Sequence, residues 1–104
     1  DMSLVQLLAR QVDKHKNNIA VTDSTGSFTY QQLDERASRL AGILQQRGWV
    51  TAAPIAICMP RSRHMVVALL AVLKAGAAYL PLDPGYPKAR LAAMLEDAGA
   101  QAML

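Results

Sequence analysis

The sequence predicts an α/β fold in which an N-terminal β-hairpin is followed by alternating helices and mostly parallel strands. Short apolar runs alternate with segments whose apolar residues recur every three to four positions, which are the patterns of buried strands and amphipathic helices. Glycines follow three of the predicted helices, at Gly48, Gly76 and Gly99, and a left-handed glycine commonly ends a helix. Such alternation favours parallel strands joined by right-handed crossovers.

A helix and a hairpin are predicted first. Ser3 can cap a helix that continues to the basic residues 14–16, which suit the C-terminal end of a helix dipole. Asn17 and Asn18 end it, and residues 19–22 and 27–29 then form the hairpin around a turn at residues 24–26. The apolar face of the helix is Leu4, Leu7, Leu8 and Val12.

A long second helix is predicted between Thr29 and Gly48. The Thr29 hydroxyl can accept a hydrogen bond from the Gln32 amide while the Gln32 side chain reaches back to the Thr29 amide, which is a capping box. The buried stripe is expected to be Leu33, Ala37, Leu40, Ala41 and Leu44. The charged residues Asp34, Glu35, Arg36 and Arg39 are expected to face water or to pair along the helix.

Residues 54–59 read as an apolar strand that Pro60 ends. Ser62 can then cap a helix that runs to Ala75. The broad apolar face of this helix is predicted to be Met65, Val66, Leu69, Leu70 and Leu73.

Residues 73–87 combine a helix end, a strand and a rigid turn. Residues 77–82 are mostly apolar, which predicts a strand that is covered on both faces. Because Pro81 cannot donate a ladder hydrogen bond, this strand is expected to end there or to lie at an edge. Asp83-Pro84-Gly85 is typical of a turn, and Pro87 suits the start of a helix at residues 87–98. A last strand follows Gly99.

Two segments resemble known sequence motifs. Residues 73–83, Leu-Lys-Ala-Gly-Ala-Ala-Tyr-Leu-Pro-Leu-Asp, with Tyr86-Pro87 beyond them, resemble the second core motif of amino-acid adenylation domains in nonribosomal peptide synthetases. Residues 28–34, Phe-Thr-Tyr-Gln-Gln-Leu-Asp, resemble the first core motif, with Gln32 where glutamate is usual. The motif residues expected to have structural rather than catalytic roles are Thr29, Tyr30, Gln32, Leu33, Lys74, Ala75, Gly76, Tyr79, Pro81, Asp83, Tyr86 and Pro87.

The resemblance implies that residues 1–104 are the N-terminal segment of an amino-acid adenylation domain, incomplete at its C-terminal end. They would form part of the large N-terminal subdomain of an adenylate-forming enzyme. The parent enzyme would use ATP and Mg²⁺ to convert an amino acid to aminoacyl-AMP and would load it onto the phosphopantetheine arm of a carrier domain. Its partners would be the remainder of the domain and neighbouring condensation and carrier domains.

No catalytic, cofactor-binding or metal-binding residue is predicted in this segment itself. In the family, the phosphate-binding loop, the amino-acid pocket and the catalytic lysine all follow the two motifs. The residues themselves agree: His15 and His64 have no partners at metal-ligand spacing, and Cys58 lies in an apolar strand as an inert thiol. Arg61 and Arg63 are expected to face solvent, with a ligand role as the alternative.

Composition excludes two classes of partner. The net charge is +3, but the basic residues are dispersed and do not alternate with stacking aromatics, so nucleic-acid binding is not expected. The longest apolar stretch, residues 65–73, is far shorter than the ~20 residues of a membrane span. We therefore expect a soluble, cytoplasmic protein.

Two other functions remain open. One is a segment of an acyl- or aryl-CoA ligase of the same superfamily, although residues 74–81 resemble the peptide synthetase version more. The other is an independent, non-catalytic α/β interaction module, which would fold cooperatively as an isolated monomer.

Overall fold

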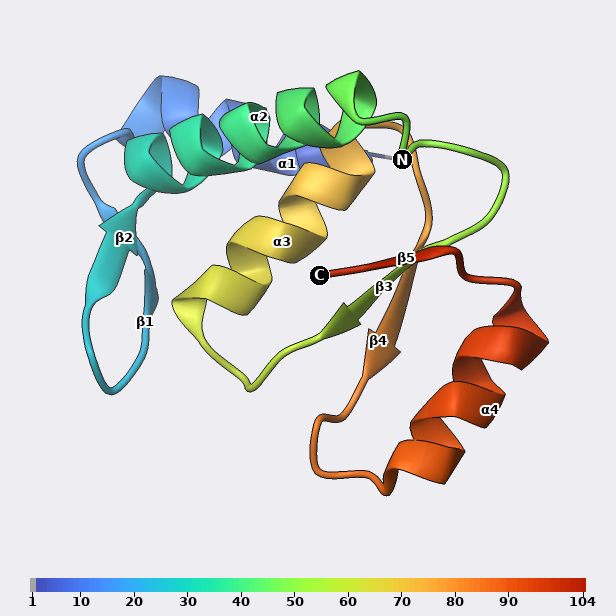
Figure 1. The fold of residues 1–104 in the computed structure, drawn as a ribbon. Coiled ribbons are helices and arrows are strands. Elements are labelled where there is room, and N and C mark those ends of the chain that lie inside the picture. Colours follow the sequence, from blue (N-terminus) through green and yellow to red (C-terminus); the bar gives the residue numbers. More distant parts are fainter. Residues whose placement is uncertain (1) are drawn as a thin grey trace.

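The computed structural model describes residues 2–104 and confirms the α/β class and the order of elements (Figure 1). A helix and a hairpin come first, and helices then alternate with strands to the end of the chain. The elements are α1 (Leu4–His15), β1 (Ile19–Thr22), β2 (Ser27–Thr29), α2 (Tyr30–Gln46), β3 (Ile55–Cys58), α3 (Arg63–Lys74), β4 (Tyr79–Leu82), α4 (Lys88–Ala98) and β5 (Ala102–Met103).

The strands form two separate sheets. β1 and β2 pair antiparallel, as the hairpin prediction requires. β3 lies between β4 and β5 in a parallel sheet with the order β4-β3-β5. The expectation that residues 77–82 are covered on both faces is wrong, because Tyr79 is 38% exposed and Pro81 is exposed as well. Among residues 2–104, β4 lies at an edge of the sheet, which confirms the alternative inferred from Pro81.

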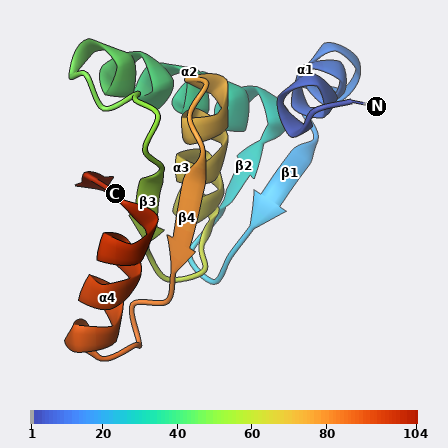
Figure 2. The ribbon, with the colours of Figure 1, turned by 90° about the vertical axis from the view of Figure 1, so that its right-hand side faces the viewer.

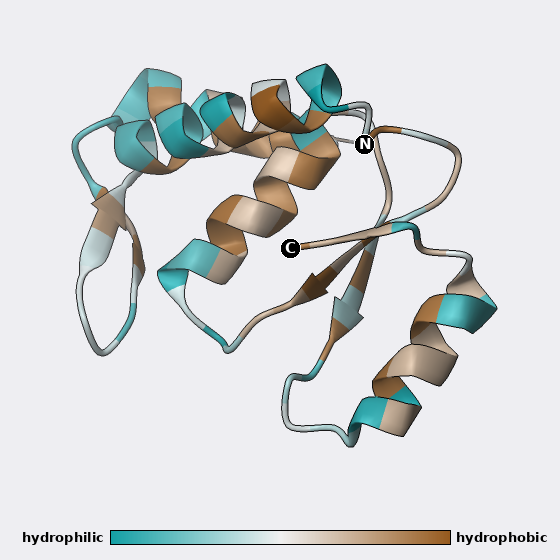
Figure 3. Cartoon of the chain, in the orientation of Figure 1, coloured by the Kyte–Doolittle hydropathy of each residue, from teal (hydrophilic) through white to brown (hydrophobic). Residues whose placement is uncertain are grey.

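Helices lie on both faces of the parallel sheet. α3 lies on one face and α4 on the other (Figures 1 and 2). α2 packs across the outside of α3, and α1 packs against α2. β3 and much of α3 carry the hydrophobic colours of Figure 3, in keeping with their place in the middle of this arrangement.

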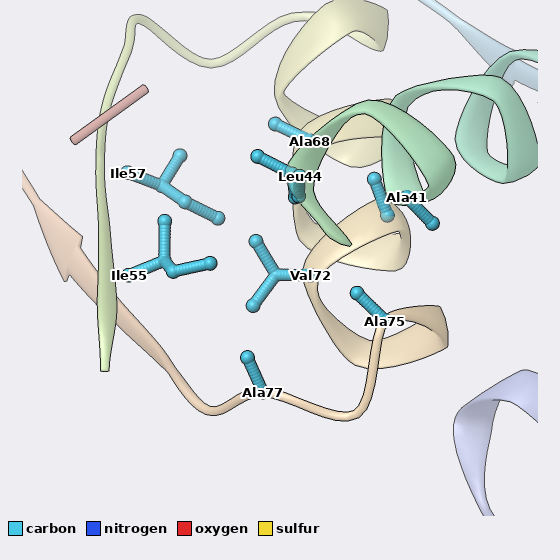
Figure 4. Packing of buried hydrophobic residues seen from close by; sticks show 9 residues of the cluster. Ala41, Leu44, Ile55, Ile57, Ala68, Val72, Ala75 and Ala77 are labelled. Atoms are coloured by element: carbon cyan, nitrogen blue, oxygen red, sulfur yellow. The ribbon is translucent and has the colours of Figure 1, made fainter. Parts of the chain in front are cut away.

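Two clusters of buried side chains hold the layers together. The first joins α2, α3 and the sheet (Figure 4), and consists of Ala41, Leu44, Ile55, Ile57, Ala68, Ala71, Val72, Ala75 and Ala77. The second joins α1, the hairpin, α2 and α3, and consists of Leu8, Phe28, Leu33, Ala37, Val67 and Leu70. Both clusters include residues of α2 and α3, so this helix pair connects the hairpin to the parallel sheet.

The predicted apolar face of α3 is largely wrong. Of its five predicted residues only Leu70 is buried, and the others are half-buried. The buried residues of α3 are Val67, Ala68, Leu70, Ala71 and Val72. Since α3 is enclosed by α2 on one side and by the sheet on the other, burial extends around the helix and is not confined to one stripe.

The predicted stripe of α2 agrees with the observed burial, whereas the predicted stripe of α1 does not. In α2, four of the five predicted residues are buried and Leu40 is half-buried. In α1 only Leu8 is buried, whereas Leu4 and Leu7 are 49% and 46% exposed. The predicted α1 face therefore lies partly in solvent.

The predicted helix ends are confirmed with small shifts. Ser3 forms a capping box with Gln6, and the Ser62 hydroxyl accepts a hydrogen bond from the Met65 amide over 3.2 Å. Gly48, Gly76 and Gly99 have φ values of 72°, 88° and 68°. α4 begins at Lys88 and Pro87 precedes it, one residue later than predicted.

Candidate functional site

The first motif segment is organised by the capping box at the start of α2. The Gln32 amide donates to the Thr29 hydroxyl over 3.1 Å, and the Thr29 amide donates to Gln32 Oε1 over 2.9 Å. The next residue, Tyr30, donates its amide to the Asn18 carbonyl over 3.0 Å. Leu33 is buried in the second cluster. These bonds connect the hairpin to α2.

Thr29→Ala is expected to lower the free energy of unfolding by roughly 0.5–2 kcal/mol, because it leaves an amide of the first turn of α2 without its acceptor. Thr29→Ser keeps the hydroxyl and is expected to cost much less. Both variants should leave unchanged, per folded molecule, any activity of the protein that carries this segment. Chemical denaturation and activity per folded molecule would test this, and loss of activity in a fully folded Thr29→Ala variant would contradict it.

The two motif segments contact each other through α2 and α3. Lys74 Nζ lies 2.5 Å from Asp34 Oδ1 and 3.1 Å from Ser38 Oγ. Gln45 Nε2 donates to the Ala75 carbonyl over 3.4 Å. Asp34 was expected to face water or to pair along its own helix, and this is wrong because its partner lies on α3. Lys74 therefore has a structural role, as expected for the motif residues, and it joins α3 to α2.

The second motif segment continues as a helix end, a strand and a turn. At Gly76 the chain leaves α3, and the Ala77 amide donates to the Val72 carbonyl over 3.1 Å. After β4, Asp83 Oδ1 accepts a hydrogen bond from the Gly85 amide over 2.8 Å, which confirms the predicted turn. The Arg90 guanidinium lies 4.0 Å from the centre of the Tyr86 ring. The Asp83–Tyr86 turn is therefore held at both ends.

An ion pair missed by sequence reasoning joins the hairpin turn to the start of α3. Asp23 Oδ1 accepts hydrogen bonds from Thr25 (amide and hydroxyl), the Gly26 amide and Arg63 Nη1, all over 2.8–2.9 Å. Its Oδ2 accepts the Arg63 amide over 2.9 Å. The expectation that Arg63 faces solvent is wrong, because its side chain is only 18% exposed. The Arg63 guanidinium also lies 4.9 Å from the centre of the Phe28 ring.

These hydrogen bonds lower the pKa of Asp23 well below its ordinary value of 3.8. The Arg63 amide is the largest cause, followed by the Thr25 amide, while burial acts in the opposite direction. A negative charge at the N-terminal end of α3 also suits its dipole. The short turn Asp-Ser-Thr-Gly could have indicated the hydrogen bonds from Thr25 and Gly26 to Asp23. Nothing in the sequence indicated the pairing with Arg63.

Asp23→Asn is expected to lower the thermal unfolding midpoint at neutral pH. The midpoint of this variant is also expected to fall less as the pH is lowered. A lowered folded-state pKa stabilises the folded protein above the ordinary value, and this stabilisation is lost as the pH falls toward the lowered value. Between about pH 6 and pH 3 the unmodified protein should therefore lose more stability than the variant. Asp13→Asn, on the exposed side of α1, is the control. Parallel pH profiles for Asp23→Asn and the unmodified protein would contradict the prediction.

The carboxyl ends of β3 and β4 border an open cleft of about 610 Å³. Open α/β sheets bind ligands at this edge. Its polar lining comes from Arg61, Asp83 and Tyr86, but the Asp83 carboxylate already accepts the turn amide. No three His, Cys, Asp or Glu side chains gather to hold a metal ion anywhere in residues 2–104. The cleft offers one exposed arginine, which can orient an anion but cannot perform chemistry alone.

Comparison with known proteins shows which family the chain belongs to. The family model described as "AMP-binding enzyme" matches residues 8–104. The chain belongs to the family of AMP-binding enzymes. It is 45% identical over 104 residues to tyrocidine synthase 3 of Brevibacillus parabrevis, covering 100% of this chain and 2% of that protein. It is 41% identical over 99 residues to gramicidin S synthase 2 of Brevibacillus brevis, covering 95% of this chain and 2% of that protein.

Solved structures show the same fold. The N-terminal subdomain of Klebsiella oxytoca NpsA superposes with a TM-score of 0.90 at 24% identity, covering 98% of this chain and 27% of that one. The same subdomain in complex with 3-hydroxyanthranilyl-AMSN gives a TM-score of 0.89 at 25% identity, covering 97% of this chain and 26% of that one. The fold expected from the resemblance, that of an adenylation-domain N-terminal subdomain, is thereby confirmed.

The chain of this AMP-binding family member spans only 2% of the length of these two synthases. Within residues 2–104, no helix is both long and apolar enough to cross a membrane. Cys58 is half-buried in β3 and is unpaired.

Proposed function

We propose that residues 1–104 are the N-terminal segment of an amino-acid adenylation domain in a nonribosomal peptide synthetase. The observation that supports this best is the similarity to tyrocidine synthase 3, which extends over the whole chain at 45% identity. The first motif segment contains the start of α2, and the second motif segment contains the end of α3. The CoA-ligase alternative and the independent module have no comparable support.

The proposed parent enzyme joins an amino acid to AMP. The amino-acid carboxylate attacks the α-phosphate of ATP, the bond to pyrophosphate breaks, and aminoacyl-AMP forms. Bound Mg²⁺ would offset the phosphate charge, and the acyl group would then pass to the phosphopantetheine thiol of a carrier domain. Carrier and condensation domains are the proposed partners, and the chain is similar to NpsA-ThdA of Klebsiella oxytoca, an artificially fused adenylation–PCP di-domain, at 25% identity.

The contribution of this segment is structural. The capping box at Thr29 fixes the first turn of α2, the Lys74–Asp34 contact holds α2 against α3, and α3 covers β3 and β4. The Asp83 turn then fixes the chain at the carboxyl edge of the sheet. We propose that the motif residues serve this scaffold, and that the groups which contact ATP come from the rest of the domain.

Amino-acid-dependent exchange of pyrophosphate into ATP tests the proposal. The longer protein that carries residues 1–104 is expected to catalyse the exchange with at least one amino acid, whereas residues 1–104 alone are expected to show none. Charge stabilisation at the α-phosphate requires several preorganised donors, and the cleft formed by the described residues offers a single exposed arginine, Arg61. Exchange by the isolated segment would contradict the structural role.

Product analysis separates the alternatives. Transfer of the acyl group to a phosphopantetheinylated carrier domain supports the peptide synthetase, whereas transfer to free coenzyme A supports the ligase. A longer protein that forms no adenylate at all would favour the interaction module.

A further inference from the structure

Three connecting segments meet at the carboxyl ends of β3 and β4 (Figure 1). They are the hairpin turn, the connection from β3 to α3 and the turn from β4 to α4. The Asp23–Arg63 ion pair joins the first two segments, and the second and third line the cleft of about 610 Å³. Open α/β sheets bind ligands at this edge, so a partner that must reach a bound ligand approaches the sheet from here.

This edge carries more positive than negative charge. Its cationic side chains are Arg61, Arg63, Lys88 and Arg90, and its carboxylates are Asp23 and Asp83. Asp23 is paired with Arg63, and the Asp83 carboxylate accepts an amide of its own turn. Within residues 2–104 no ion pair includes Arg61, which is exposed and lines the cleft. The Arg61 charge is therefore available to an anionic group from outside this segment.

The remaining lining of the cleft is mostly apolar. Met59, Met65 and Met94 contribute to it from three different parts of the chain, and each is half-buried. Methionine side chains are unbranched and flexible, so they adapt to the shape of a partner side chain. The Tyr86 ring also lines the cleft and is held by the Arg90 guanidinium. Methionine, tyrosine and arginine are enriched in protein–protein interfaces, which have an apolar centre and a polar rim.

We propose that this cleft docks an acidic surface of the carrier domain, with an apolar carrier side chain among the methionines and a carboxylate facing Arg61. The inference rests on the proposed function. In the transfer step the carrier thiol loses its proton, its sulfur bonds to the acyl carbon, and AMP leaves. The thiol reaches that carbon only when the carrier contacts the edge of the sheet where ligands bind. The unpaired arginine determines the charge of the matching surface, because complementary charges favour docking.

Loading of a carrier domain that is added as a separate chain tests the proposal. The protein that carries this segment is prepared without its own phosphopantetheine arm, so that only the added, phosphopantetheinylated carrier is loaded. Arg61→Glu is expected to raise the KM for the carrier at least about tenfold and to change kcat by less than about twofold. Arg61→Lys keeps the charge and should restore most of the loss. Added salt should raise the KM of the unmodified protein more than that of Arg61→Glu.

Arg10→Glu is the matched control, because it makes the same charge change at an exposed position of α1, away from the cleft (Figure 2). Equal KM values for Arg10→Glu and Arg61→Glu would overturn the inference. So would loss of pyrophosphate exchange in a folded Arg61→Glu variant, which would assign Arg61 to the adenylation site. A thermal midpoint much lower than that of Arg10→Glu would also overturn it, since the cleft would then be filled by another part of the same protein.

Pyrophosphate exchange, which needs no carrier, separates this inference from the proposed function. Absence of exchange in the unmodified protein would refute the proposed function and this inference with it. Normal exchange, together with a KM for the carrier that Arg61→Glu leaves unchanged, would refute this inference alone.

Discussion

Leu44→Ala is expected to lower the free energy of unfolding of the domain by about 2–5 kcal/mol. Leu44 is 2% exposed and lies where α2 meets α3 and the sheet, with Ile57 and Ala68 in the same cluster (Figure 4). Truncation removes apolar contacts and leaves a cavity, because the surrounding backbone elements relax only in part. Chemical denaturation would measure the loss.

The neighbouring residue provides the control for this prediction. Ile43 precedes Leu44 in the same helix but is 39% exposed. Ile43→Ala removes as many carbon atoms from the same helix, yet it leaves no enclosed cavity and is expected to cost well under half as much. Similar losses for the two variants would show that the α2–α3–sheet cluster is not the stabilising core.

Local chemistry explains why the helix ends could be predicted from the sequence. The capping bonds of Ser3 and Thr29 span three residues, and the Asp83 turn spans two. A cap needs only its own residue and the next helical turn, so the sequence contains the whole interaction. Element boundaries agree within one or two residues for the same reason.

Interactions between distant segments could not be predicted in this way. Asp23 and Arg63 are 40 residues apart, as are Asp34 and Lys74, and each residue alone is typical of a solvated surface. The partner becomes known only once the hairpin turn is placed beside the start of α3.

The predicted apolar face of α3 and the predicted burial of both faces of β4 were wrong for a related reason. The periodicity of a helix shows that one side of it is buried. How many other elements pack around the helix depends on how helices and sheet are layered in the whole fold. An apolar run such as residues 77–82 is typical of a strand covered on both faces, yet sheet order is a property of the whole fold. Pro81 was the only local signal of an edge.

The same distinction between local and distant interactions applies to the candidate site. The two motif segments were found from the sequence, and the structure explains their residues through caps, a helix end and a turn. Their contact through Lys74 and Asp34 was not foreseen, because it joins two helices. That these residues act only as scaffold stays a proposal, which the pyrophosphate exchange assay tests.

Gly76→Val is expected to lower the free energy of unfolding by on the order of 1–3 kcal/mol or more, because residue 76 has φ of +88° and a β-branched side chain is strained there. A Cβ atom at this position would have no atom within 4 Å, so the cost comes from the backbone and not from a steric clash. Gly76 lies where α3 ends and the chain turns into β4, so the backbone cannot relax without moving the edge strand.

Two further variants isolate the cause. Gly42→Val introduces the same side chain in the helical interior of α2, where a Cβ atom again meets nothing within 4 Å, and it is expected to change stability by less than about 0.5 kcal/mol. Gly76→Asn should cost less than Gly76→Val, because asparagine tolerates the left-handed region. Denaturation midpoints of the three variants decide between backbone strain and side-chain bulk as the cause. If Gly42→Val were as damaging as Gly76→Val, side-chain bulk and not the left-handed backbone would be responsible.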